Sequence, residues 1–199
     1  MRRGGWWGVA FVIGLLVSAA MVSLPTAAEP AEKIRSFYNA HGQIIVWQQV
    51  IGALSLVPFI AFALALNSRS PSRWLIPATL LLAAVQLVTS VVPLIIVLTS
   101  DVTPESARSL TRVEDLADAA LFVTVALFVV AATLREPSWV RALAIVVAVA
   151  SLIRAIASPL GVTALDFAAP LAFVAFVLLL SVRMLAGSAP AKRPATTLR

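Results

Sequence analysis

The residues of this chain that could do chemistry are a few polar side chains set inside long apolar stretches. Asp118, Arg154 and Gln48 each lie about four residues inside the expected outer end of such a stretch. At a helical rise of about 1.5 Å per residue, this places all three about 6 Å deep. Asp118 is the natural counter-ion of Arg154, so we predict an ion pair between them.

The predicted pair admits two interpretations. In the structural one, which we favour, the arginine extends towards the interface and the pair only fixes how helices pack. In the functional one, the pair forms the floor of an outward-open polar pocket, with Gln49 near its mouth. The candidate polar cluster consists of Asp118, Arg154, Gln48, His41, Asp115 and Asp166.

The usual signatures of catalysis and metal binding are absent from the sequence. His41 is the single histidine and there is no cysteine, so paired-histidine and thiolate metal sites are excluded. Nucleophile elbows and phosphate-binding glycine loops are absent too. We therefore predict no catalytic residue, no metal and no cofactor. An intramembrane enzyme would need the carboxylates at 115, 118 and 166 to converge with His41.

The elements that must position these residues are predicted to be transmembrane helices. Apolar residues make up 61% of the chain and charged residues 12%, far from the proportions of a soluble domain. Crossing a hydrocarbon core takes roughly 20 apolar residues in a helix. Stretches of that length predict an all-α bundle of six spans as one domain, over residues 6–25, 44–66, 74–99, 116–134, 139–158 and 164–185. Gln86 of the third span lies near mid-membrane, where it could mark a pathway.

The distribution of charge predicts that both termini are cytoplasmic. Basic residues in short loops are retained inside. This orientation gathers most basic residues on the inner side with Glu136 alone as an acid: Arg2, Arg3, Arg69, Arg73, Arg135, Arg141, Arg183, Lys192, Arg193 and Arg199. The net charge of +6 is therefore a topology signal and not a sign of nucleic-acid binding. We expect the bilayer of a bacterial inner membrane as the surroundings.

The first span and three segments outside the spans carry predictions of their own. The first span has an alternative interpretation as a secretory signal cleaved near Ala27 and Ala28, which we disfavour because the stretch is long enough to span and the match is poor. Residues 30–42 predict a short amphipathic helix in the outer interface. Thr103 and Pro104 predict the cap and first turn of another helix, which could continue into the fourth span. The tail at 187–199 is predicted to be disordered.

Several short motifs resemble a known group of proteins. They are the segments at 36–41 (SFYNAH), 115–118 (DLAD), 136–139 (EPSW) and 180–183 (LSVR). Together they are similar to six-span integral membrane proteins of high-GC, actinobacterial-type bacteria that form a family of unknown function. The resemblance implies a fold, but it implies no activity and no catalytic residue.

Two classes of function remain. The first is a non-enzymatic accessory or envelope-associated component that meets a membrane protein partner, a second copy of itself or lipid through its outer segments. The alternative is a small transporter or binder of a hydrophobic or anionic compound, with its site at the level of Asp118 and Arg154. A transporter needs polar residues in the inner halves of its helices too, and these halves are almost entirely aliphatic.

Overall fold

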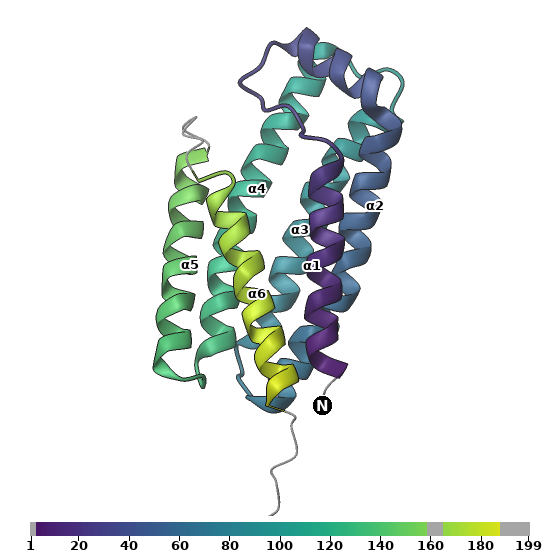
Figure 1. The fold of residues 1–199 in the computed structure, drawn as a ribbon. Coiled ribbons are helices and arrows are strands. Elements are labelled where there is room, and N and C mark those ends of the chain that lie inside the picture. The colour runs from purple at the N-terminus through teal and green to yellow at the C-terminus, as the bar shows by residue number, and fades with distance from the viewer. Residues whose placement is uncertain (1–2, 159–164, 188–199) are drawn as a thin grey trace, which may run out of the picture.

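The computed structural model describes residues 3–158 and 165–187, and these form a bundle of long helices with no strand among them (Figure 1). The helices are α1 (Arg3–Met21), α2 (Ala31–Arg69), α3 (Leu75–Leu98), α4 (Pro104–Thr133), α5 (Ser138–Ala157) and α6 (Ala168–Ala186). All six are long and apolar enough to cross a membrane. The predicted all-α fold with six spans is confirmed, and the chain is a multi-pass membrane protein. The expected start of the sixth span, at residue 164, and the predicted disordered tail beyond Gly187 lie outside the described residues.

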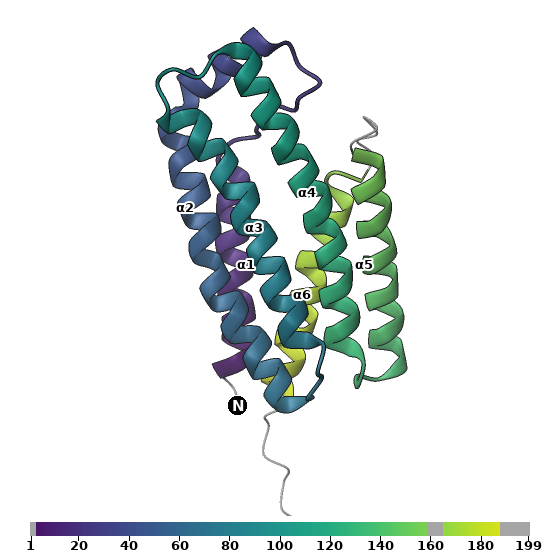
Figure 2. The same ribbon diagram turned by 180° about the vertical axis from the view of Figure 1, so that it is seen from behind.

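The helices form a closed ring. Each one packs against its neighbours in the sequence, and α6 returns to pack against α1. Figures 1 and 2 show the ring from opposite sides, with α1, α2 and α3 on one side and α4, α5 and α6 on the other. An additional contact between α2 and α4 crosses the ring. A closed ring of six helices has an interior, and the polar residues inside the apolar stretches can meet there.

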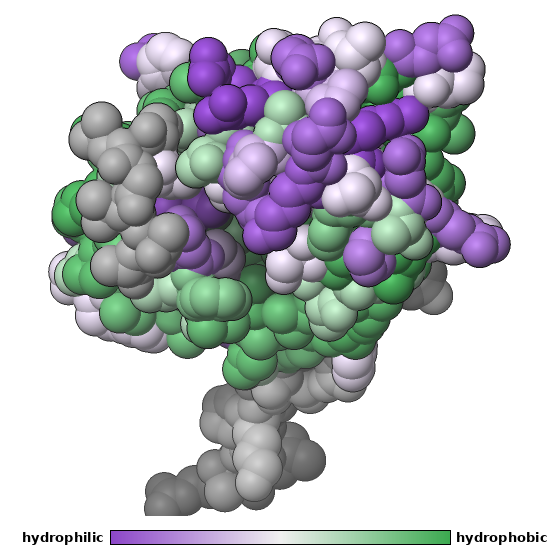
Figure 3. Space-filling model, turned by 90° about the horizontal axis from the view of Figure 1, so that it is seen from above, coloured by the Kyte–Doolittle hydropathy of each residue, from purple (hydrophilic) through white to green (hydrophobic). Residues whose placement is uncertain are grey.

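The two ends of the ring differ in charge. One end, called the basic end here, holds the start of α1, the end of α6 and the α2–α3 and α4–α5 connections. Its charged residues in the described part are Arg3, Arg69, Arg73, Arg135, Arg141, Arg183 and Glu136. The opposite end, called the acidic end, carries most of the carboxylates. Seen from above that end, hydrophilic side chains gather over the tops of the helices, whereas the flanks are hydrophobic (Figure 3). The flanks are the lipid-facing surface.

The predicted outer helices are extensions of two spans, and neither is a separate element. At about 1.5 Å per residue, the 39 residues of α2 and the 30 of α4 reach about 58 Å and 45 Å, well beyond a hydrocarbon core of about 30 Å. We expected the first outer helix to end near Gly42. The helix continues because a lone glycine costs only about 1 kcal/mol in a helix interior, and because Ile34 and Tyr38 are fully buried against the neighbouring helices. The predicted start of α4 is confirmed, since the Thr103 hydroxyl accepts a hydrogen bond from the Ser106 amide.

Close packing of α1 against α6 closes the ring at the basic end. A side chain at Gly8 would collide with the Ser181 hydroxyl and with the ring of Phe62. A side chain at Gly5 would lie 2.6 Å from the Ser181 carbonyl oxygen and from Leu185. Small residues at membrane helix contacts let backbones approach and gain van der Waals contact. The N-terminal glycines therefore serve helix packing.

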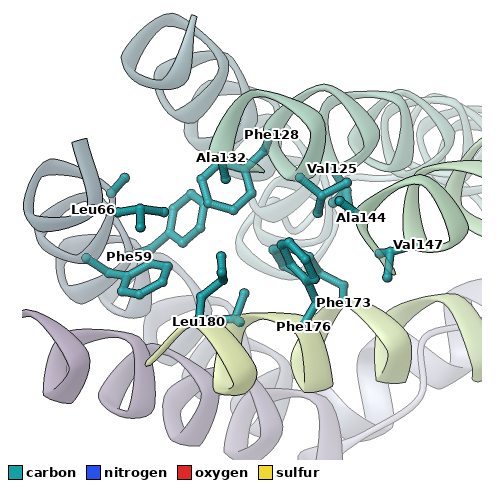
Figure 4. Close-up of a cluster of buried hydrophobic side chains, with 14 of the residues drawn as sticks. Phe59, Leu66, Val125, Phe128, Ala132, Ala144, Val147, Phe173, Phe176 and Leu180 are labelled. Carbon is teal, nitrogen blue, oxygen red and sulfur yellow. The ribbon is translucent and has the colours of Figure 1, made fainter. Parts of the chain in front are cut away.

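The basic half of the ring is filled by aromatic side chains. Phe59 of α2 lies with its ring centroid 4.7 Å from that of Phe11 and 4.9 Å from that of Phe128. Phe173 of α6 joins them edge-on from the other side. Figure 4 shows Phe59, Phe128 and Phe173, with Leu66 and Leu180 beside them, in the space between the helices. The interior is thus solid in this half and leaves no polar path in the described residues.

Candidate functional site

Arg154 is the centre of the polar site. Its Nη1 donates to Asp118 Oδ2 at 2.7 Å, and its Nε lies 3.5 Å from Asp166 Oδ1. The guanidinium also lies over the Phe122 ring, 3.9 Å from the centroid. The structure therefore contains the predicted Asp118–Arg154 pair, and it adds Asp166 as a second carboxylate partner.

Burial makes this cluster more than a surface ion pair. The Arg154 side chain is 11% exposed and the two carboxylate side chains are each 31% exposed. Phe122 and Ala155 are buried directly beside it and pack with Ala169. A guanidinium held by two carboxylates and an aromatic face has little freedom to turn. Arg154 therefore ties α4, α5 and the start of α6 together.

Gln48 lies in the same interior, and its orientation is set by α1. Its Nε2 donates to the carbonyl oxygens of Ser18, at 3.2 Å, and Val22, at 2.7 Å. Carbonyl oxygens only accept, so the amide nitrogen must face α1 and the amide oxygen must face away from it. That oxygen, Oε1, is buried and has no hydrogen-bond partner in the described part of the chain. A buried unpaired acceptor is costly and calls for a donor.

The Gln48 interaction is one of three caps that α2 provides. The last turn of a helix presents carbonyl groups that the helix does not fully satisfy, and a positive charge there also complements the helix dipole. Arg35 donates to Ile96 O of α3 at 3.0 Å, and Arg69 donates to Arg183 O of α6 at 3.1 Å. Together with Gln48 on α1, these bonds make α2 the helix that organises the bundle.

A cavity of about 290 Å³ lies inside the ring, in its acidic half. All six helices contribute side chains to its wall. The floor is apolar and consists of Phe11, Leu56, Leu82, Val125 and Phe173. Several of these residues belong to the aromatic core that fills the basic half. The polar part of the wall is formed by Gln48, Gln49, Gln86, Glu114, Asp118 and Arg154. The cavity is therefore closed towards the basic end and polar towards the acidic end.

Three of the predicted site residues do not line this cavity: Asp166, which pairs with Arg154 beside it, and Asp115 and His41. Asp115 accepts a hydrogen bond from the Ala27 amide at 2.9 Å, while Arg108 donates to the Ala27 carbonyl. Asp115 thus holds the α1–α2 loop against α4. His41 is exposed, stacks on Phe37 and uses Nδ1 to bond the Phe37 carbonyl oxygen. The structure does not bring Asp115 and His41 to the Arg154 cluster: Asp115 is engaged by the α1–α2 loop, and His41 lies seven residues, about 10 Å, beyond Gln48 along α2.

Glu114 is the residue of the cavity wall that the sequence reasoning missed. It precedes Asp118 by four residues, a spacing that places both on one helix face. No lysine or arginine of the described residues lies within ion-pairing distance of it. Gln86, noted only as a pathway marker, also lines the cavity and donates from Nε2 to the Thr89 hydroxyl at 3.1 Å. The four-residue spacing of the carboxylates was the signal that could have found Glu114.

No group of three or more histidine, cysteine or carboxylate residues in the described ranges could hold a metal ion. Comparison with known proteins finds no matching family model, no matching curated protein and no matching solved structure.

Proposed function

We propose that this protein is a non-enzymatic membrane component that binds a small, largely hydrophobic molecule inside its helix ring. The observation that carries the proposal is the interior cavity, with an apolar floor and polar groups confined to one side. Sites for small molecules are mostly apolar hollows of about 300–1,000 Å³ with a few convergent polar groups. A cavity of about 290 Å³ is at the small end of that range.

Binding is better supported than transport. A transporter must give its substrate access from both sides of the membrane. Below this cavity, Phe11, Phe59, Phe128 and Phe173 are in mutual contact and nearly all fully buried. A path to the basic end would require this aromatic core to separate. The Arg154 cluster is the structural tie of the cavity wall in this proposal.

The cavity faces the outside of the cell in our proposal. The basic end carries arginines and one described acid, and the positive-inside rule assigns such an end to the cytoplasm. We assign the chain to the cytoplasmic membrane of a bacterium because its short motifs resemble those of six-span proteins of high-GC bacteria. The acidic half of the ring, with the cavity, then lies in the outer leaflet.

Photolabelling with a diazirine analogue of octanol tests the proposal. The purified protein in lipid nanodiscs is irradiated with the probe, and labelled peptides are identified by mass spectrometry. We expect labelling of cavity residues, such as Leu121, that excess octanol abolishes. The lipid-facing surface also takes up the probe, but without saturation. Labelling that is confined to the outer surface and does not saturate contradicts the proposal.

A pair of neighbouring alanines provides a matched control. Both are exposed on α1, but Ala19 lines the cavity and Ala20 does not. Ala19→Phe should fill cavity space and abolish the saturable labelling. Ala20→Phe adds the same side chain to the same helix and should leave the labelling intact. Equal loss in both variants would show that the labelling depends on α1 and not on the cavity.

A further inference from the structure

The polar wall of the cavity is rich in hydrogen-bond acceptors. Gln48 Oε1 is buried with no partner among the described residues, and its amide cannot be reversed because the nitrogen donates to two carbonyl oxygens. The Gln86 amide is oriented in a similar way. The Thr89 hydroxyl donates to the backbone carbonyl oxygen of Gln86, so its own oxygen accepts the hydrogen bond from Gln86 Nε2. This leaves the Gln86 Oε1 acceptor without a partner in the described residues. Two glutamines thus offer oxygen atoms to whatever occupies the cavity.

The charges around the cavity also favour a donor. Glu114 and Asp118 lie in the wall, and Asp166 lies beside it. Arg154 is the single cation among them in the described residues, and it is already shared between Asp118 and Asp166. The Glu114 carboxylate is left without a cation. An anionic ligand would be repelled by the carboxylates of this wall, whereas a protonated amine would give Glu114 the counter-ion that it lacks in the described residues.

A nine-tenths buried polar side chain supplies independent support. Gln49 is 9% exposed and lines the cavity, and its amide makes no hydrogen bond within the described residues. Buried amide groups are nearly always hydrogen-bonded. The Gln49 amide offers an acceptor next to that of Gln48. Together with the free Gln48 oxygen, it indicates that a polar group of a ligand belongs in this part of the cavity.

We infer that the cavity selects an amphipathic amine. Its protonated nitrogen lies between Glu114 and the side-chain oxygens of Gln48 and Gln86, and its apolar body lies on the phenylalanine floor. This inference rests on the proposed function and names its ligand class. A protonated amine supplies several N–H donors and one positive charge, which match the acceptors and the uncompensated carboxylate. The apolar body occupies the part of the cavity lined by Phe11, Phe173 and Leu82.

Competition against the photoreactive octanol tests the charge preference. Octylamine, octanol and octanoate share one chain and differ in head group. A hydrogen bond to a charged group is worth enough to change affinity by about tenfold or more. We expect octylamine to displace the probe at a concentration about tenfold lower than octanol does, and octanoate to be weaker than octanol.

Two variants separate the cavity from partition into the membrane. Glu114→Gln should reduce the preference for octylamine over octanol by about tenfold, with the octanol competition unchanged. Asp115→Asn removes the adjacent carboxylate, which bonds to Ala27 and lies outside the cavity, so the preference should persist. Membrane partition is the same for both variants and cancels in the ratio.

The outcomes distinguish the inference from the proposed function. If octanol competes saturably but octylamine has no advantage, or keeps its advantage in Glu114→Gln, the amine inference is overturned while the binding function stands. If none of the three compounds reduces labelling of cavity residues in the wild type, both are overturned.

Discussion

Replacing Arg154 should destabilise the protein more than replacing its partner Asp118, because the two losses leave different charges behind. Arg154→Gln leaves two carboxylates, Asp118 and Asp166, without their cation. Asp118→Asn leaves Arg154 still paired with Asp166. Removing one partner of a fully buried pair costs about 3–5 kcal/mol, whereas exposed pairs contribute about 0–1 kcal/mol. The Arg154 side chain, 11% exposed, is close to the buried case, and the carboxylates, at 31%, are intermediate.

These exposures set the expected magnitudes. We expect Arg154→Gln to lower the free energy of unfolding by about 2–3 kcal/mol and Asp118→Asn by about 1 kcal/mol. The double variant should be less destabilised than the two changes added together, by about 1 kcal/mol of coupling. A smaller coupling than for a fully buried pair is expected because Asp166 compensates in part.

The assay is reversible unfolding in mixed micelles with increasing SDS, followed by the fluorescence of the five tryptophans. The Glu29–Lys33 pair at the start of α2, whose lysine side chain is 69% exposed, is the control and should show coupling below about 0.5 kcal/mol. The reasoning is refuted if Asp118→Asn costs as much as Arg154→Gln, or if the coupling between them equals that of the control pair.

Three further predictions concern the core, the closure of the ring and the topology. Phe59→Ala should lower the free energy of unfolding by about 2–3 kcal/mol in the same assay. This is at or below the lower end for buried phenylalanines in water-soluble proteins, because lipid is already apolar and mainly the packing is lost. Phe167→Ala, at an 83% exposed site, should cost almost nothing, and equal costs would contradict the packing argument. Gly8→Leu should separate α1 from α6 because its side chain would collide with α6; faster proteolysis of the folded protein would reveal the separation, and unchanged proteolysis would refute it. Because the chain has no native cysteine, single cysteines report topology: in intact cells an impermeant maleimide should label Asp101→Cys and not Ser68→Cys, and the opposite result would invert the orientation.

Hydropathy alone was sufficient to predict the spans, but the ends of the helices depended on tertiary contacts. The first span was predicted to reach residue 25, whereas α1 ends at Met21. Gln48 Nε2 of α2 donates a hydrogen bond to the carbonyl oxygen of Val22, just beyond that end. The outer segment at 30–42 was expected to be separate, but it continues into α2 because Ile34 and Tyr38 find a buried place among α3 and α4. Neither contact has a local signal.

The candidate site shows the same division. Depth along a helix follows from counting residues, and it brought Asp118 and Arg154 together correctly. Counting residues does not show that Asp115 bonds to the α1–α2 loop or that α2 carries His41 to an exposed position, so both were placed in the cluster. Glu114 was overlooked although it shares a face with Asp118.

The sequence by itself therefore determined which segments enter the membrane, at what level each polar residue lies and how charge is divided between the two ends. These properties are local, because each residue carries its own preference for lipid or water. The tertiary structure alone decided that α6 closes against α1, that α2 caps three neighbours and that a cavity remains above the aromatic core. Those features depend on the rotation and tilt of every helix, which are set by side-chain packing among all six helices at once.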